Sequence, residues 1–137
     1  MSRHYLLDTN IISRAARDPR GRLALRMLET GEERLFTSVI VLAEIRYGLA
    51  RNPEARARAQ IEELVAAMDV RDLPYAAAQH YGRVRHALER QGRPIGGNDY
   101  WIAAHALSDD AILVSNNVRE FARVPGLSLE DWVGNAS

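Results

Sequence analysis

The stretch HYLLDTNIIS, residues 4–13, decides the fold of this chain. Tyr5–Leu7 form a short apolar run that ends on Asp8, and a second apolar run follows two polar residues later. This pattern predicts a buried strand over Tyr5–Leu7 and a helix over Ile11–Ala16. A carboxylate directly after a buried strand is costly unless it is hydrogen-bonded, paired or bound to a metal. Asp8 is therefore either a helix cap, a role that Thr9 also fits, or part of a site.

Length and composition predict one ordinary globular domain over residues 1–137. The 137 residues are 47% hydrophobic and 26% charged, which is enough to bury a substantial core. Asp8 interrupts any signal-peptide apolar segment, and no apolar run is long enough to cross a membrane. We therefore expect a cytoplasmic protein without a membrane partner. The absence of cysteine excludes disulfides and thiolate metal ligands.

The basic residues exclude several kinds of phosphate chemistry. The formal net charge is zero, and all 18 basic residues are arginine. A P-loop site, a receiver domain and a haloacid-dehalogenase-type phosphatase each need a lysine. No G-x-S-x-G motif is present for a serine nucleophile. The four histidines show no metal-ligand spacing and are expected to be surface or packing residues; they are His4, His80, His86 and His105.

Alternating strand and helix patterns predict an α/β fold with a parallel sheet. The predicted strands cover residues 5–7, 35–37, 70–73 and 111–114, with a last edge strand over residues 127–132. The predicted helices cover residues 11–16, 22–29, 39–50, 54–68, 75–91 and 99–107. Right-handed crossovers bring the carboxyl ends of the first and fourth strands to one side of the sheet.

Glu44 lies in a predicted helix, residues 39–50, that is apolar on nearly all sides. The residues three and four positions away carry no charge, so the helix itself offers no salt-bridge partner. Three alternatives stay open for this glutamate: it extends into solvent, it pairs with Arg46 or another arginine, or it binds an ion.

A second acid, Asp99, begins the predicted helix of residues 99–107. Helical spacing places it at the top of the buried stripe formed by Ile102, Ala103 and Leu107. Asn98 is the more natural cap for that helix, which leaves Asp99 available for a site. The fourth strand ends on the polar cluster of residues 115–117, as the first strand ends on a polar cluster.

These positions predict one acidic pocket at the edge of the sheet. Asp8, Glu44 and Asp99 would share it, with the polar residues 115–117 beside them. Three close carboxylates cannot all stay ionised without a cation. Oxygen ligands favour a hard ion such as Mg²⁺ or Mn²⁺. Such an ion activates water and stabilises the charge that develops on phosphorus, so the pattern predicts metal-assisted hydrolysis of a phosphate ester.

Four stretches in register resemble the VapC-type toxins of the PIN-domain family. They are LLDTNIIS, SVIVLAEIRYGLA, GRPIGGNDYWIAAHAL and LVSNNVREFARVPGLSLEDW. The resemblance implies a PIN-like three-layer α/β/α sandwich around a short, mostly parallel β-sheet. It also implies a Mg²⁺- or Mn²⁺-dependent endoribonuclease that acts as the toxin of a type II toxin–antitoxin system and inhibits translation.

The resemblance carries the metal and catalytic roles onto Asp8, Glu44 and Asp99. The fourth catalytic position, often an aspartate in the family, falls on Asn117, and Ser115 stands where threonine is commoner. These two departures weaken the case for a second metal. The supporting polar residues are Asn10, Ser115 and Asn116.

The same resemblance implies a homodimer, a VapB-type antitoxin as partner, and a toxin–antitoxin hetero-oligomer. Its RNA substrate is expected to be a transfer RNA, often initiator transfer RNA cut in the anticodon loop; other members cut ribosomal RNA. Phosphate contacts are expected from local arginines, in particular Arg46 and Arg93.

Two alternatives remain at the level of the sequence. One is a non-catalytic PIN-fold module that binds RNA or protein, and the intact acids argue against it. The other is a nuclease that acts on DNA.

Overall fold

The computed structural model describes residues 3–53 and 55–134, and within these it describes the side chains of all but residues 55 and 56. Its centre is one sheet of five short strands in the order β3-β2-β1-β4-β5. Every strand pairing is parallel, so the sheet is parallel throughout and not merely for the most part. The strands are β1 (Tyr5–Leu7), β2 (Leu35–Ser38), β3 (Val70–Arg71), β4 (Ile112–Val114) and β5 (Ser128–Glu130).

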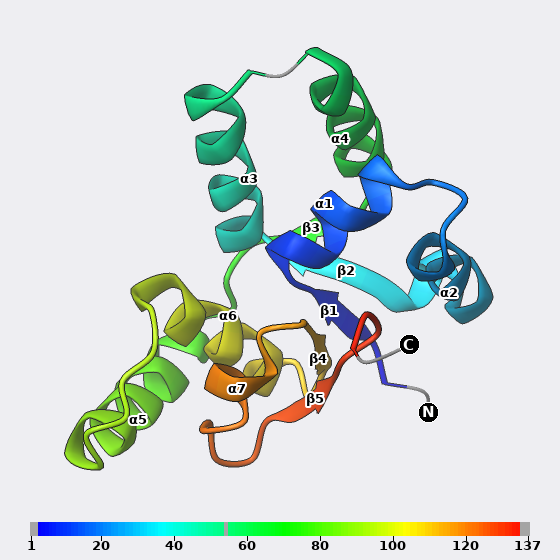
Figure 1. Ribbon diagram of the computed structural model, residues 1–137. Helices are drawn as coiled ribbons and strands as arrows, with labels where there is room; N and C mark the ends of the chain where they lie inside the picture. Colours follow the sequence, from blue (N-terminus) through cyan, green and yellow to red (C-terminus); the bar gives the residue numbers. More distant parts are fainter. Residues whose placement is uncertain (1–2, 54, 135–137) are drawn as a thin grey trace.

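Helices cover both faces of this sheet (Figure 1). They are α1 (Thr9–Arg17), α2 (Arg22–Thr30), α3 (Val39–Arg51), α4 (Ala55–Ala67), α5 (Ala77–Arg90), α6 (Gly97–Ser108) and α7 (Val118–Phe121), with a 3₁₀ turn, η1 (Glu32–Arg34), before β2. None of the helices in the described part of the chain is long and apolar enough to cross a membrane.

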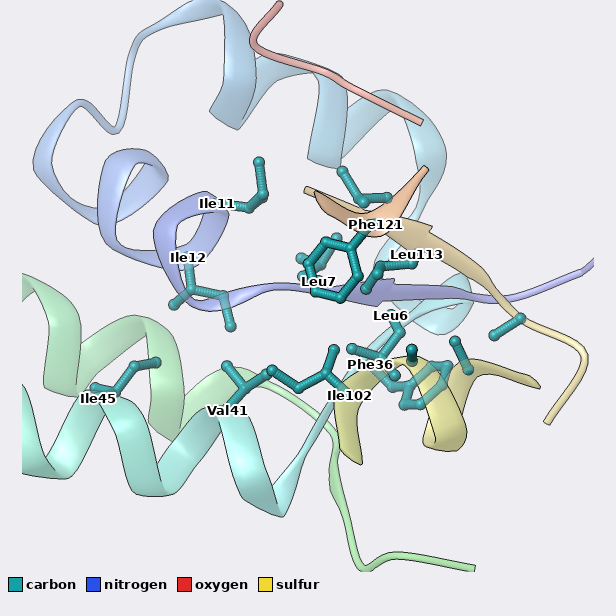
Figure 2. Close-up of a cluster of buried hydrophobic side chains, with 14 of the residues drawn as sticks. Leu6, Leu7, Ile11, Ile12, Phe36, Val41, Ile45, Ile102, Leu113 and Phe121 are labelled. Atoms are coloured by element: carbon teal, nitrogen blue, oxygen red, sulfur yellow. The ribbon is translucent and has the colours of Figure 1, made fainter. Parts of the chain in front are cut away.

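The core lies on both sides of β1. Leu6 and Leu7 are fully buried and point to opposite faces, as successive strand residues do. Figure 2 shows Phe121 above β1 on the side of α1, and Phe36 and Ile102 below it on the side of α3 and α6. The predicted three-layer sandwich is therefore confirmed.

Element boundaries differ from the sequence prediction where turn residues intervene. The helix predicted over residues 75–91 begins at Ala77, because the chain turns at Pro74, whose carbonyl accepts from the Ala77 amide at 2.9 Å. The last helix before β4 begins at Gly97 with Gly96 as its cap, so Asn98 lies inside the first turn and is not the cap.

The strand predicted over residues 70–73 ends at Arg71, and the one over 127–132 shortens to Ser128–Glu130. The sequence did not predict α7. Glu54, the predicted start of the fourth helix, lies outside the described residues.

The strand order makes a switch point between β1 and β4. From β1 the chain proceeds outward to β2 and β3, whereas β4 and β5 lie on the other side of β1. The amide of Asp8, just beyond β1, donates to the Val114 carbonyl at the end of β4 at 3.0 Å. Such switch points at carboxyl strand ends are where open α/β sheets bind ligands.

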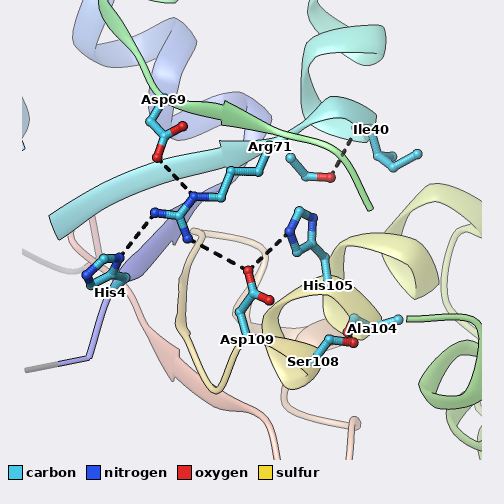
Figure 3. Close-up of polar contacts among 9 residues, drawn as sticks. His4, Ile40, Asp69, Arg71, Ala104, His105, Ser108 and Asp109 are labelled. Carbon is cyan, nitrogen blue, oxygen red and sulfur yellow. Dashed lines mark hydrogen bonds and ion pairs between the residues drawn. The ribbon is translucent and has the colours of Figure 1, made fainter. Parts of the chain in front are cut away.

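Toward the opposite, amino ends of β1 and β4, charged groups pair with one another (Figure 3). Arg71 donates to Asp69 at 2.9 Å, lies 3.8 Å from Asp109, and stacks over the Phe36 ring at 3.9 Å. His105 is fully buried beside that ring, and its Nε2 lies 3.4 Å from Asp109. Burial lowers the pKa of His105, which fits the predicted packing role.

Candidate acidic site

Asp8 is both the cap of α1 and a buried site carboxylate. Its Oδ1 accepts from the Thr9 amide at 2.8 Å, and its Oδ2 accepts from the Ser115 hydroxyl at 2.7 Å. Only 6% of the residue is exposed. Burial raises the pKa of Asp8; the bonds from Ser115 and Thr9 oppose this rise and the charge of Glu44 adds to it. The two roles considered from the sequence are therefore compatible, because each carboxylate oxygen accepts one hydrogen bond here and keeps a further lone pair.

Glu44 is half-buried on α3 and faces Asp8. Its Oε1 accepts a hydrogen bond from the Thr9 hydroxyl, and its Oε2 accepts from the Asn98 side-chain amide at 3.4 Å. The alternative pairing with Arg46 is wrong, because Arg46 forms its ion pair with Glu62 on α4. Both donors to Glu44 are neutral, so they orient the carboxylate without cancelling its charge.

Asp99 reaches the same place from the first turn of α6. It is half-buried, and its pKa rises to about 7. Burial is the largest cause, followed by the negative charges of Asp8, Glu44 and Glu120. A carboxyl group with this pKa exchanges a proton near neutral pH.

These acids line one open pocket of about 640 Å³, which we call the acid pocket. Its lining residues are Asp8, Thr9, Asn10, Ser13, Arg17, Glu44, Asp99, Asn116, Asn117 and Glu120. The structure thus brings together the three predicted acids and the predicted amides at positions 10, 116 and 117.

The remaining predicted residues lie outside this lining. Ser115 is fully buried behind the pocket, where its Oγ donates to Asp8 and accepts from the Asn117 amide at 2.9 Å. The two predicted RNA contacts, Arg46 and Arg93, are exposed and do not line the pocket.

Glu120 is the site residue that the sequence prediction missed. It lies on α7, three residues beyond Asn117, and its charge acts on Asp99. The sequence signal for it was an acid in the short segment VREF, which directly follows the polar residues at the end of β4. The fourth acid of this pocket is therefore Glu120, whereas Asn117 contributes a neutral amide.

The donor set fits a hard cation. All the pocket carboxylates offer oxygen, and in residues 3–53 and 55–134 no arginine forms an ion pair with Asp8, Glu44 or Asp99. The Oδ1 atom of Asn10 is also buried there without a hydrogen-bond partner. Among the described residues, no three carboxylates are yet close enough around one point to form a complete ligand set.

Comparison with known proteins agrees with this geometry. Residues 5–127 match the PIN domain. The chain is 42% identical over 130 residues to the tRNA(fMet)-specific endonuclease VapC of Shigella flexneri, with 93% of this chain and 97% of that protein covered. It is 40% identical over 131 residues to Ribonuclease VapC1 of Haemophilus influenzae, with the same coverage of both chains.

A solved structure of a VapBC complex is also similar to this chain. The DNA-bound VapBC of Salmonella typhimurium superposes with a TM-score of 0.85 at 34% identity, covering 96% of this chain and 99% of that one. The parallel sheet, the acid pocket and the match over residues 5–127 show that the chain belongs to the PIN-domain family. Its relatives place it among the VapC-type toxins of that family.

Proposed function

We propose that this chain is a metal-dependent endoribonuclease, the toxin of a type II toxin–antitoxin pair, that hydrolyses RNA phosphodiester bonds. The observation that carries the proposal is the acid pocket at the switch point of the sheet, where four carboxylates lie together without an arginine partner among the described residues. The names of the relatives, an endonuclease and a ribonuclease, support the same activity.

The carboxylates at positions 8, 44, 99 and 120 would hold a Mg²⁺ or Mn²⁺ ion. When bound, such an ion supplies an activated water and stabilises the charge that develops on the phosphodiester. The protein's part is to orient these carboxylates with neutral donors. Ser115 and the Thr9 amide fix the two oxygens of Asp8, and the Thr9 hydroxyl fixes Glu44. A carboxylate oxygen of the pocket that is not in contact with the ion can accept the proton of the attacking water.

The substrate we propose is transfer RNA, with initiator transfer RNA as the first candidate. This choice rests on the relative that is 42% identical and named as specific for tRNA(fMet). The zero net charge of the chain predicts that recognition depends on local arginines and not on a general attraction to RNA.

We propose a VapB-type antitoxin as partner, with a homodimer of the toxin inside the complex, in the cytoplasm. Exposed apolar surface supports a protein partner: Leu28 on α2 is 76% exposed at the edge of an apolar hollow of about 540 Å³ between α1, α2 and α4. Leu28→Glu should weaken co-purification with the antitoxin while RNA cleavage persists, whereas Tyr75→Glu, at an exposed site far from this hollow, should leave the complex intact.

Cleavage of purified RNAs tests the function. Initiator transfer RNA, other transfer RNAs, ribosomal RNA and single-stranded DNA would each be incubated with Mg²⁺, with Mn²⁺ and with EDTA. Asp99→Asn removes one pocket charge, and Asp109→Asn is the matched control at the other end of the sheet. A discrete RNA product that needs metal and Asp99 would establish the activity. Binding without cleavage by folded wild type would favour the non-catalytic module, and cleavage confined to DNA would favour the DNA nuclease.

A further inference from the structure

A narrow groove of about 150 Å³ continues from the acid pocket along α1, α3 and α4. The two hollows share the side chains of Thr9, Ser13, Arg17 and Glu44, so they form one continuous surface. The groove ends near Arg58 of α4. Figure 1 shows α1 beside both α3 and α4, and it contacts each of them.

Gly48 lines this groove without a side chain that would extend into it. It lies one helical turn after Glu44 on α3, and a Cβ atom placed on it would meet no atom within 4 Å. Its φ is not positive, so backbone conformation does not require glycine there. Glycine inside a helix costs about 0.5–1 kcal/mol relative to alanine. The packing of the chain therefore does not require glycine at this position, and the missing side chain leaves space in the groove.

Arg17 supplies a cation at the junction of the two hollows. It is exposed on the last turn of α1, and in the described part of the chain its side chain has no hydrogen-bond or ion-pair partner. Arg58, at the other end of the groove, is already engaged by the Leu49 carbonyl at 3.4 Å and by Glu62 at 3.6 Å. Arg17 is therefore the guanidinium that is available for an anion beside the acids.

The charges favour a nucleic-acid strand as the occupant. Four carboxylates repel phosphates, so a strand with one phosphodiester in the acid pocket needs a cation for the neighbouring phosphate. A guanidinium binds phosphate in bidentate fashion, and such backbone contacts set the position of a strand. We propose that the groove holds the RNA segment next to the scissile phosphodiester, with Arg17 as the positioning residue for its phosphate and Gly48 as the gap that admits the strand. This proposal rests on the proposed function.

A side chain added at position 48 tests the role of the groove separately from that of Arg17. Gly48→Gln would be compared with Gly82→Gln, because Gly82 is also an exposed glycine inside a helix, on α5, whose added Cβ meets nothing within 4 Å. Both variants should fold with a Tm equal to or above that of wild type, since each removes a helix glycine. Gly48→Gln should weaken the Kd by about tenfold or more, equal to about 1.4 kcal/mol, and Gly82→Gln should not.

Binding would be measured by anisotropy with fluorescent initiator transfer RNA, on an Asp99→Asn background in which the RNA stays uncleaved. This readout separates the two proposals. Wild type that cleaves no RNA overturns the proposed function, whereas equal affinity of Gly48→Gln and its control overturns the groove even if cleavage is found.

Removing the cation tests Arg17. On the same background, Arg17→Gln should lower the slope of log K against log salt by about 0.7, the contribution of one phosphate contact in a single strand. Arg17→Lys should restore much of that slope. Arg14→Gln, on an exposed part of the same helix outside both hollows, should leave it nearly unchanged.

A salt slope that is the same for Arg17→Gln and Arg14→Gln would overturn the role of Arg17. If Gly48→Gln and Arg17→Gln bind RNA normally but no longer form the complex with the antitoxin, the groove is a protein-binding surface and the RNA proposal is wrong.

Discussion

The two ends of the parallel sheet treat their carboxylates in opposite ways. At the amino ends, Asp69 and Asp109 share the guanidinium of Arg71 (Figure 3). At the carboxyl ends, the hydrogen bonds that Asp8 and Glu44 accept within the described part of the chain come from neutral hydroxyl and amide groups. An ion pair cancels charge, whereas a neutral donor orients a carboxylate and leaves it negative. This difference indicates that Asp69 and Asp109 stabilise the fold, whereas Asp8 and Glu44 keep a negative charge that a cation can bind.

Neutralising one acid at each end of the sheet tests this difference most directly. Asp99→Asn should lower the rate of RNA cleavage by on the order of 100- to 1000-fold, because it removes preorganised charge from the acid pocket. Asp109→Asn should leave the rate within about twofold, the ordinary range for a change away from the reacting atoms. Gel assays with initiator transfer RNA would measure both. Equal losses would show that the two ends do not differ in function.

A metal ion should stabilise one end alone. Saturating Mg²⁺ or Mn²⁺, at about 100 times its Kd, should add about 2.7 kcal/mol to the free energy of unfolding of wild type. EDTA should reverse the gain, and Asp99→Asn should reduce it while Asp109→Asn keeps it. Thermal unfolding monitored by circular dichroism would report the shift. The absence of any metal-dependent shift in folded wild type would contradict the metal site.

Removing Arg71, whose guanidinium reaches toward the amino ends of β1 and β4, should lower stability and leave the cleavage rate unchanged. Arg71→Ala removes the cation that Asp69 and Asp109 share and removes the stacking over Phe36. We expect a loss of about 1–2 kcal/mol in urea unfolding, with an unchanged cleavage rate for the folded protein. Arg90→Ala, exposed on α5, is the control and should change stability by less than about 0.5 kcal/mol.

The two candidates for the fourth site position can be ranked by substitution. Glu120→Gln should lower the cleavage rate by on the order of tenfold, since it removes a pocket charge that acts on Asp99. Asn117→Ala should lower it by less, because the side chain of Asn117 is neutral. Rates at saturating RNA would decide the order. A larger loss for Asn117→Ala would restore the sequence-based choice of that residue.

A pH dependence of stability should also belong to one end of the sheet. Asp99 holds its proton up to about pH 7 in the folded state, compared with about 3.8 in the unfolded chain. Between these values the folded state binds more protons, so the free energy of unfolding should fall as pH rises from about 4 to about 7. Below pH 4 this contribution is complete, and above pH 7 it is lost.

Thermal unfolding in EDTA would show this contribution as a difference between wild type and Asp99→Asn that changes across the same window. The profile of Asp109→Asn should run parallel to that of wild type. A constant difference between wild type and Asp99→Asn from pH 4 to 8 would rule the titration out.

Local patterns accounted for most of the fold and part of the site. Tyr5–Leu7 were predicted as a strand with the bounds that the structure gives. The prediction succeeded because a short apolar run between polar residues indicates directly which residues are buried. Asp8 was predicted as a candidate site residue by the same kind of local argument, because a carboxylate directly after a buried strand is costly without a partner. The cap of α6 was misassigned to Asn98 because Gly96 has no side chain to signal its role.

By itself, the sequence determined the alternation of strands and helices, the positions of three acids, and the exclusion of lysine and cysteine chemistry. Only the tertiary structure decided which side chains share the acid pocket. Glu120 lines the pocket from α7, and Arg46 does not pair with Glu44 because it binds Glu62 on α4. Hydrophobic periodicity depends on residues that are neighbours along the chain. These contacts depend instead on how separate helices pack against one sheet, and a local sequence pattern does not contain that information.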